Sequence, residues 1–273
     1  MDAISLSHDL REAALVWLCE TEAITKAQGV IELGKYYGYS LNIEAQLIST
    51  QAIPGLPAKP ELVSPLSVKK RSMRTVVGRA TLIHALAHIE FNAINLALDA
   101  IWRFSHMPRQ YYVDWLKVAA EEAYHFSLLN DHLHRLGYAY GDFSGHNSLW
   151  EMVDRTKHDV LARMALVPRT MEARGLDANP RLRNKLLQAG DVKAAEILDI
   201  ILRDEIGHVA IGNTWFNWLC AQQKLAPIAT FEALCIDYGA PKLRPPFNLE
   251  ARRKAGFSEA ELVLLNQMFL DKH

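Results

Sequence analysis

Two short motifs pair a carboxylate with an imidazole at a spacing that suits one face of a helix. They are Glu122-Ala-Tyr-His125 and Glu205-Ile-Gly-His208. Residues three apart lie on the same side of an α-helix, so each glutamate and its histidine can reach one metal ion. A single copy would be weak evidence, because Glu and His occur on many solvated helix faces.

Apolar residues at helical spacing surround both motifs, which predicts that the two pairs are buried. The two stripes consist of Trp115, Val118, Leu129 and Leu133 around the first motif, and of Leu198, Ile201, Leu202 and Val209 around the second. A buried carboxylate is costly unless it meets positive charge. A bound metal ion is one way to supply that charge.

Two further glutamates, Glu90 and Glu172, lie on apolar helical faces upstream of the motifs. Either glutamate alone could be a core-edge residue paired with an arginine. The spacing from Glu90 to Glu122, however, nearly equals the spacing from Glu172 to Glu205. The chain therefore contains two similar halves, each with a one-glutamate helix followed by a Glu-x-x-His helix.

This pattern is that of a di-iron carboxylate bundle, in which two helices give one Glu each and two give Glu-x-x-His. The predicted ligands are Glu90, Glu122, His125, Glu172, Glu205 and His208. Oxygen and imidazole ligands without thiolate suit two iron ions, with manganese as the alternative metal.

Four long helical segments are expected to position these ligands. Their approximate ranges are residues 74–106, 109–136, 149–173 and 192–222, the last of them capped by Asp191. Residues 176–190 look helical enough to extend the third segment. Pro168 should kink that segment just before Glu172, because proline removes a backbone donor.

The ends of the chain lie outside these four segments. Asp9–Gln28 has the apolar spacing of a helix, with Gly29 as its expected stop. Residues 42–66 are rich in proline and are expected to form an irregular strap over the bundle. The tail closes with a short helix that Ser258 and Glu261 begin as a capping box.

The expected fold is therefore all-α, a four-helix bundle with an N-terminal strap and a C-terminal tail. The expected domains are an N-terminal helix and strap (residues 1–72), the di-metal bundle (73–223) and the tail (224–273).

The composition is that of a globular protein without a strong net charge. Half of the 273 residues are hydrophobic and the formal net charge is −1, which disfavours broad binding to nucleic acid or anionic membranes. Cys19, Cys220 and Cys235 lack CxxC spacing and indicate a reducing compartment. No leader or membrane-spanning run is visible, so a cytoplasmic location and no membrane partner are expected.

The motifs resemble those of a known family in the ferritin-like superfamily. They are His84-Ala-Leu-Ala-His88-Ile-Glu90, Glu121-Glu122-Ala-Tyr-His125, Arg203-Asp-Glu205-Ile-Gly-His208 and the tail segment Pro245–Phe257. Together they are similar to the bacterial ferritin-like family of domain of unknown function 455, over nearly the whole chain. The resemblance implies a di-metal bundle and no particular substrate. The metal motifs also resemble, more distantly, those of tRNA-modifying hydroxylases.

Several polar residues near the motifs have both a functional and a structural interpretation. His84 and His88 could bind zinc, but His88 faces away from Glu90 and is expected in a polar seam with Asn92, Asn95 and Asp99 against the strap. The other residues weighed are Glu121, Tyr124, His132, His134, His158, Asp204 and the basic run Lys69, Lys70, Arg71 and Arg74. We expect Glu121, His132 and His134 at the surface, Tyr124 in packing and His158 in the core. Asp204 is either solvated or an orienting group for a ligand imidazole.

Function follows from the predicted site. Our main hypothesis is an oxygen-dependent oxidase or monooxygenase that needs dioxygen, an electron donor and an unidentified organic substrate. One alternative is a ferroxidase, for which iron itself is the substrate; another is a metal-stabilised binding module without catalysis. A tRNA substrate reached through the basic run is a narrower version of the first hypothesis, and a side-by-side homodimer is compatible with a long bundle.

Overall fold

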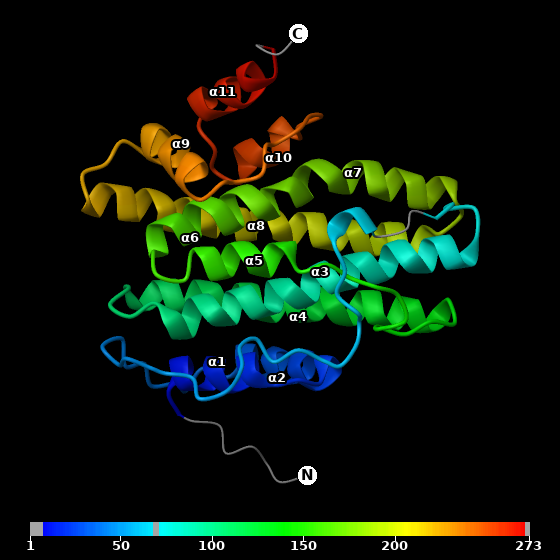
Figure 1. Ribbon diagram of the computed structural model, residues 1–273, viewed down its shortest axis with the longest axis horizontal. Coiled ribbons are helices and arrows are strands. Elements are labelled where there is room, and N and C mark those ends of the chain that lie inside the picture. The colour runs from blue at the N-terminus through cyan, green and yellow to red at the C-terminus, as the bar shows by residue number, and fades with distance from the viewer. Residues whose placement is uncertain (1–7, 68–70, 271–273) are drawn as a thin grey trace. The chain divides into compact units, whose positions relative to one another are not determined.

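The computed structural model describes residues 8–67 and 71–270 (Figure 1). Within these ranges every regular element is a helix and there is no strand, so the predicted all-α class is confirmed. The chain divides into two compact units, Met1–Trp150 and Glu151–His273. The domain boundaries expected after residues 72 and 223 stay a prediction.

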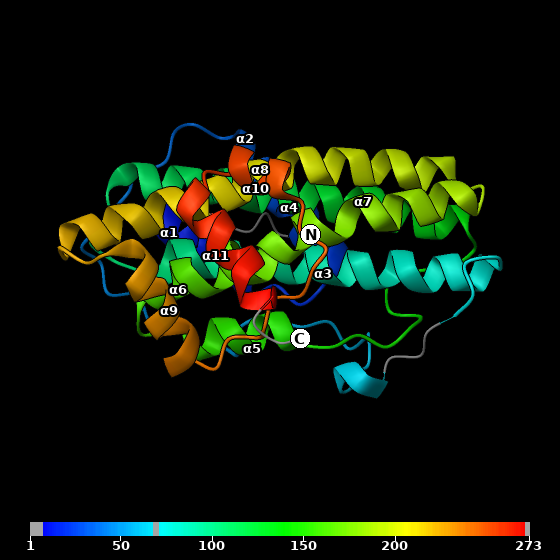
Figure 2. The same cartoon turned by 90° about the horizontal axis from the view of Figure 1, so that it is seen from above.

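A helical hairpin forms the centre of the first unit. Its arms, α3 (Val76–Arg103) and α4 (Arg109–Arg135), lie side by side (Figures 1 and 2). Thr75 begins α3 by accepting a hydrogen bond from the backbone N–H of Gly78 at 3.1 Å. Pro108 precedes α4 and requires no N–H partner there. The two predicted helices are confirmed, with ends shifted by up to three residues.

Two helices, α1 (Leu10–Cys19) and α2 (Ala23–Lys35), take the place of the single helix expected over Asp9–Gln28. Helix α1 packs on α3, and α2 packs on α4. The prediction that Gly29 ends a helix is wrong, because Gly29 lies inside α2. A Cβ at Gly29 would lie only 2.0 Å from the Trp17 ring, so this glycine makes room for the indole.

An irregular segment follows α2, as expected for a strap, and its only helical turn in the described ranges is η1 (Pro65–Ser67). Arg11, only 1% exposed, ties this segment to the end of α3. Its guanidinium donates to the carbonyl of Trp102 at 2.7 Å and to those of Ala45 and Asn42 at 2.7 and 3.0 Å. A cation at a helix C-terminus is also favoured by the helix dipole.

Replacing this guanidinium should therefore destabilise the protein. We expect Arg11→Met to lower the free energy of unfolding by about 2–4 kcal/mol, because several buried carbonyls lose their donor. Chemical denaturation measures this. The matched control is Lys35→Met, which removes an exposed ion pair with Glu32 and should cost less than about 1 kcal/mol. Equal effects of the two substitutions would show that Arg11 does not anchor the strap.

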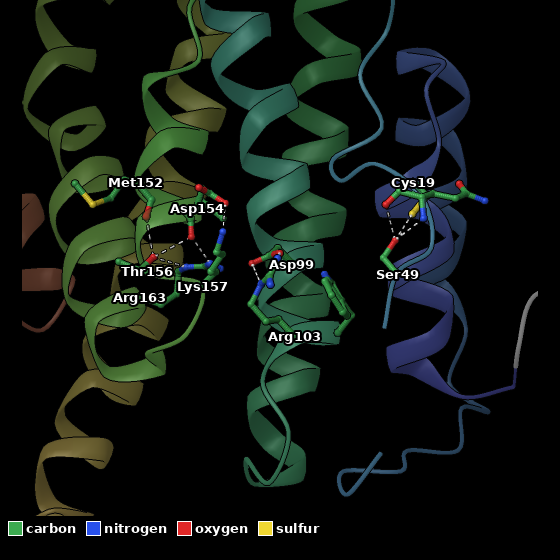
Figure 3. A network of polar contacts seen from close by, with 12 residues as sticks. Cys19, Ser49, Asp99, Arg103, Met152, Asp154, Thr156, Lys157 and Arg163 are labelled. Atoms are coloured by element: carbon green, nitrogen blue, oxygen red, sulfur yellow. Dashed lines mark hydrogen bonds and ion pairs between the residues drawn. The ribbon is translucent and has the colours of Figure 1, made fainter. Parts of the chain in front are cut away.

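The second unit contains a segmented helix in place of the single helix expected over residues 149–173. Its parts are α5 (Ser148–Arg155, in this unit from Glu151), α6 (Val160–Leu166), the π-helix η2 (Val167–Glu172) and α7 (Ala173–Gln188). The break before α6 has a clear cause, since Asp159 caps the new helix and Thr156 accepts from Nε of Arg163 at 2.8 Å (Figure 3). The prediction missed this cap because apolar spacing continues across it.

A single long helix, α8 (Val192–Gln222), follows as predicted and lies along α7 (Figure 2). Asp191 begins it by accepting from the backbone N–H of Ala194 at 3.1 Å. Helix α7 covers most of the extension expected over residues 176–190. No helix in the described part of the chain is long and apolar enough to cross a membrane.

Up to residue 270 the tail forms three helices, namely α9 (Pro227–Asp237), α10 (Leu249–Lys254) and α11 (Glu259–Leu270). The expected capping box is confirmed, since the N–H of Ser258 donates to Glu261 Oε2 at 2.8 Å and the N–H of Glu261 donates to Ser258 Oγ at 3.4 Å. The tail joins a core cluster of the second unit made by Ala173, Leu176, Val209, Ala251, Ala255, Phe257 and Leu262. Helices α9 and α10 were missed because they are short, and α9 buries no residue fully.

Candidate metal centre

Three of the six predicted ligands meet inside the first unit. Glu90 of α3 and Glu122 and His125 of α4 are each at most 4% exposed. Nδ1 of His125 lies 3.3 Å from Glu90 Oε2 and 3.4 Å from Glu122 Oε2. Their candidate ligand atoms all lie within 4.8 Å of one another, so this cluster could bind a metal ion. We call these three residues the first half-site.

The helices place these side chains together for simple reasons. Glu122 and His125 are three residues apart on α4, so they share the face that packs against α3. On either side of them the same face carries Val118 and Leu129, both fully buried. The predicted burial of this motif is therefore confirmed.

Electrostatics in the first half-site oppose the metal-free state. Removal from water raises the pKa of Glu90 well above its usual value, and the nearby charge of Glu122 raises it further, against the opposing effect of His125. Two carboxylates in one dry place repel each other unless a proton or a cation lies between them.

Chemistry and spacing of the donors fit a metal ion. Two ligands at about 2.1 Å from one ion are separated by about 3.0 Å at a right angle and about 3.4 Å at the tetrahedral angle. The measured separations of 3.3 and 3.4 Å fall in this interval, although they equally allow N–H···O hydrogen bonds. Carboxylate and imidazole donors without thiolate are typical of iron and manganese sites.

The other three predicted ligands lie in the second unit. Glu205 and His208 are on α8, at 9% and 0% exposure, with Nδ1 of His208 3.8 Å from Glu205 Oε1. Glu172 is the last residue of η2 and is 8% exposed. All three are thus buried, as the apolar stripes predicted, and we call them the second half-site. Their convergence with the first half-site stays a prediction.

The π-helix η2 sets the position of Glu172, its last residue. Pro168 has no N–H to donate, and the backbone widens so that the N–H of Ala173 reaches the carbonyl of Pro168. The Thr170 side chain also donates from Oγ1 to the carbonyl five residues earlier, that of Ala165, at 2.9 Å. Gly212 of α8 admits Pro168, because a Cβ there would lie 2.5 Å from the proline ring. Single π turns inside α-helices occur often at functional sites.

His84 and His88 contact the loop after α4. The backbone N–H of Gly141 donates to Nε2 of His84 at 2.9 Å. Nδ1 of His88 is 2.8 Å from the Tyr140 hydroxyl, and its Nε2 is 3.1 Å from the His146 carbonyl. Burial lowers the pKa of both imidazoles to about 4, so both are neutral at pH 7. These two partners of His88 belong to the loop after α4, and its expected contact with the strap stays a prediction.

Asn95 is the residue of the predicted seam whose contact with the N-terminal segment the structure shows. Asn95 accepts from Nζ of Lys26 at 2.6 Å, and Lys26 also donates to the Gly55 carbonyl at 2.9 Å. Asp99 pairs with Arg103 at 2.6 Å (Figure 3).

The remaining weighed residues divide between confirmed and wrong expectations. Glu121, 3.9 Å from Lys117, is partly exposed and His134 is exposed, as expected. His132 is buried and His158 is exposed, both contrary to expectation, because α4 turns the former inward and the helix break moves the latter out. Tyr124, which was expected in packing, is 44% exposed. Asp204 pairs with Arg203 at 2.8 Å, and its alternative role beside a ligand imidazole stays a prediction.

Of the basic run, Lys69 and Lys70 lie outside the described residues. Arg71 and Arg74 are exposed at the start of the α3 region.

The fold and the two half-sites define an all-helical protein with a buried cluster of carboxylates and imidazole that could hold a metal ion. The chain belongs to the family described as Protein of unknown function (DUF455), whose model matches residues 19–263. It is 50% identical over 224 residues to an uncharacterized protein of Haemophilus influenzae, covering 80% of this chain and 78% of the relative. No solved structure matches the chain.

Removing one carboxylate should stabilise the metal-free protein. After chelator treatment at pH 7, we expect Glu90→Gln to raise the free energy of unfolding, by about 1.4 kcal/mol for each pH unit that separates the unfolded pKa of Glu90 from pH 7 or from its folded pKa, whichever is lower. A carboxyl group whose folded pKa is raised costs stability as the pH rises above its unfolded pKa of about 4.3. The gain should therefore vanish near pH 4, as denaturation across this range can test. A destabilised variant at pH 7 would contradict the argument.

Proposed function

We propose that this chain is a ferritin-like di-metal carboxylate protein, for which the residues of the two half-sites supply the ligands of two iron ions. The observation that carries the proposal is the burial of Glu90, Glu122 and His125 with their donor atoms within 4.8 Å of one another. The second half-site repeats the same residue types on a second pair of helical segments. This repetition supports the four-helix, two-ion arrangement over a single isolated ion.

Iron is the metal that fits the proposal best, with manganese as the alternative. The donor set is four carboxylates and two imidazoles, and it contains no thiolate that would favour zinc or an iron–sulfur cluster. When bound, a pair of iron ions would supply the reduction of dioxygen and the oxidation of a substrate. The apolar surroundings of α3 and α4 would exclude water from that chemistry.

We further propose that the substrate is organic, which makes the protein an oxidase or monooxygenase that needs dioxygen and an electron donor. The support is that the chain has additional helices outside the segments that carry the ligands. Helices α1 and α2 cover the hairpin of the first unit, and the tail helices add to the core of the second. Such additions suit a closed substrate-binding enzyme better than a minimal storage bundle.

Metal content tests the ligand set. Protein purified without chelator should contain two iron or manganese ions per chain by elemental analysis. Glu122→Gln and Glu205→Gln should each lower the metal affinity by about tenfold or more, because each removes a charged ligand. Affinity should also rise with pH, since Glu90 must lose its proton to bind.

The control is Glu121→Gln, which changes the adjacent, partly exposed carboxylate. It should leave metal content unchanged. If Glu122→Gln lowers metal content and Glu205→Gln does not, the site uses the first half-site alone, and the two-ion proposal fails.

Dioxygen consumption tests the reaction. Iron-loaded protein with a reductant and a small-molecule cell extract should consume dioxygen through many turnovers, and Glu122→Gln should fall to background. Uptake that stops in proportion to added ferrous iron, with ferric mineral accumulating, would identify a ferroxidase instead. Metal-dependent thermal stability without any dioxygen uptake would identify a binding module.

A further inference from the structure

A large cavity lies within the second unit, and none of the predicted metal ligands lines it. Its volume is about 770 Å³, within the range of small-molecule sites. The walls come from η2, α9, α10, α11 and the segment between α9 and α10. They are mostly apolar, with Phe231, Phe247, Phe257, Leu264 and Leu265 among the lining residues. We call this cavity the tail pocket.

Arg169 of η2 is the polar group that distinguishes the tail pocket. Its side chain is 2% exposed and lies against three aromatic rings, with Cζ 4.5, 4.7 and 5.1 Å from the centroids of Phe216, Phe231 and Phe257. Nε donates to Asn213 at 2.7 Å, and Nη2 pairs with Glu261. Among the described residues, Nη1 has no hydrogen-bond partner. A buried donor without an acceptor favours a ligand that provides one.

Charge in the tail pocket favours an anion. Among the described residues, four basic side chains line it, Arg169, Lys242, Arg244 and Arg252, against two acidic ones, Glu232 and Glu261. The basic residues are not equivalent. Arg252 is buried and already held by Asp177 at 2.6 Å, whereas Lys242 and Arg244 are exposed. The buried donor that still lacks an acceptor therefore belongs to Arg169.

We propose that the tail pocket binds an aliphatic monocarboxylate, whose carboxylate accepts from Nη1 of Arg169 and whose chain lies along the phenylalanine and leucine side chains. The apolar walls account for the chain, and the excess of basic residues accounts for the charge of the head group. A guanidinium that is already oriented by Asn213 and Glu261 holds its free donor in a fixed direction. This site is separate from the metal centre and does not require it.

Isothermal titration calorimetry of the full-length protein with dodecanoate, below its micelle concentration, tests the proposal. Dodecanol is the matched probe, because it keeps the chain and lacks the carboxylate. We expect dodecanoate to bind one per chain and about tenfold or more tightly than dodecanol. Absence of binding, or equal binding of the two probes, overturns the proposal.

The same titration after chelator treatment removes one competing explanation, since a carboxylate can also ligate a metal ion. Dodecanoate should bind the metal-free protein with unchanged affinity. Loss of binding on metal removal would place the carboxylate at the metal centre and overturn the tail-pocket site. This outcome also separates a failure of the tail-pocket proposal from a failure of the metal proposal.

Variants then locate the bound chain. Leu264→Trp should fill the tail pocket and weaken dodecanoate binding about tenfold or more. Val263→Trp is the matched control, because Val263 is the preceding residue of α11, is 51% exposed and does not line the pocket. Equal affinities in these two variants would overturn the proposal.

Two further variants locate the head group. Arg169→Gln should remove the preference for dodecanoate over dodecanol, and Leu264→Trp still decides the question if Arg169→Gln does not fold. Lys242→Gln combined with Arg244→Gln should change affinity by less than about threefold. A preference that survives Arg169→Gln and disappears in the double variant would place the carboxylate at the exposed rim and overturn its assignment to Arg169.

Discussion

A dry interior tolerates several carboxylates only when positive charge or protons accompany them, and this constraint shapes both units of the protein. In the first unit, Glu90 and Glu122 share one imidazole within about hydrogen-bonding range. The raised pKa of Glu90 expresses the cost of that arrangement in the absence of a cation. A fold that keeps such a cluster, rather than replacing it with apolar side chains, has retained it against its own stability.

Elsewhere the protein meets the same constraint with its own cations. Arg11 is buried, and backbone carbonyls accept hydrogen bonds from its guanidinium. Arg252 is buried and pairs with Asp177. These sites show how a buried charge is satisfied by the protein alone. The half-sites differ from them because acid exceeds base there, which is the condition that a metal ion relieves.

Sequence patterns predicted the elements whose signals are local and repeated. The prediction of α3, α4 and α8 followed from long apolar stripes, and the start of α8 followed from its cap, Asp191. Burial of the six predicted ligands followed from the same stripes, since a carboxylate that interrupts an apolar face must turn inward with it. What the patterns predict beyond this, the meeting of the two halves, depends on contacts between distant segments.

Features that depend on tertiary contacts were not predictable in this way. Gly29 looks like a stop signal, and only the Trp17 ring explains its place inside a helix. Apolar spacing does not indicate the break at Thr156–Asp159. The Asp159 cap changes the backbone there, but the spacing of apolar residues continues across it. Arg169 also went unnoticed, although an arginine directly after an apolar run and a proline is a signal that could have indicated it.

The π turn has one more consequence, which concerns rotational phase. An α-helix turns about 100° per residue, so a single residue accommodated in a wider turn rotates everything after it by that amount relative to an uninterrupted helix. The six residues of η2 contribute to two different sites. Arg169 lines the tail pocket, while Glu172 belongs to the second half-site. Deleting one residue from η2 could leave every residue of both sites present. It would still rotate α7, and Glu172 directly before it, relative to α6.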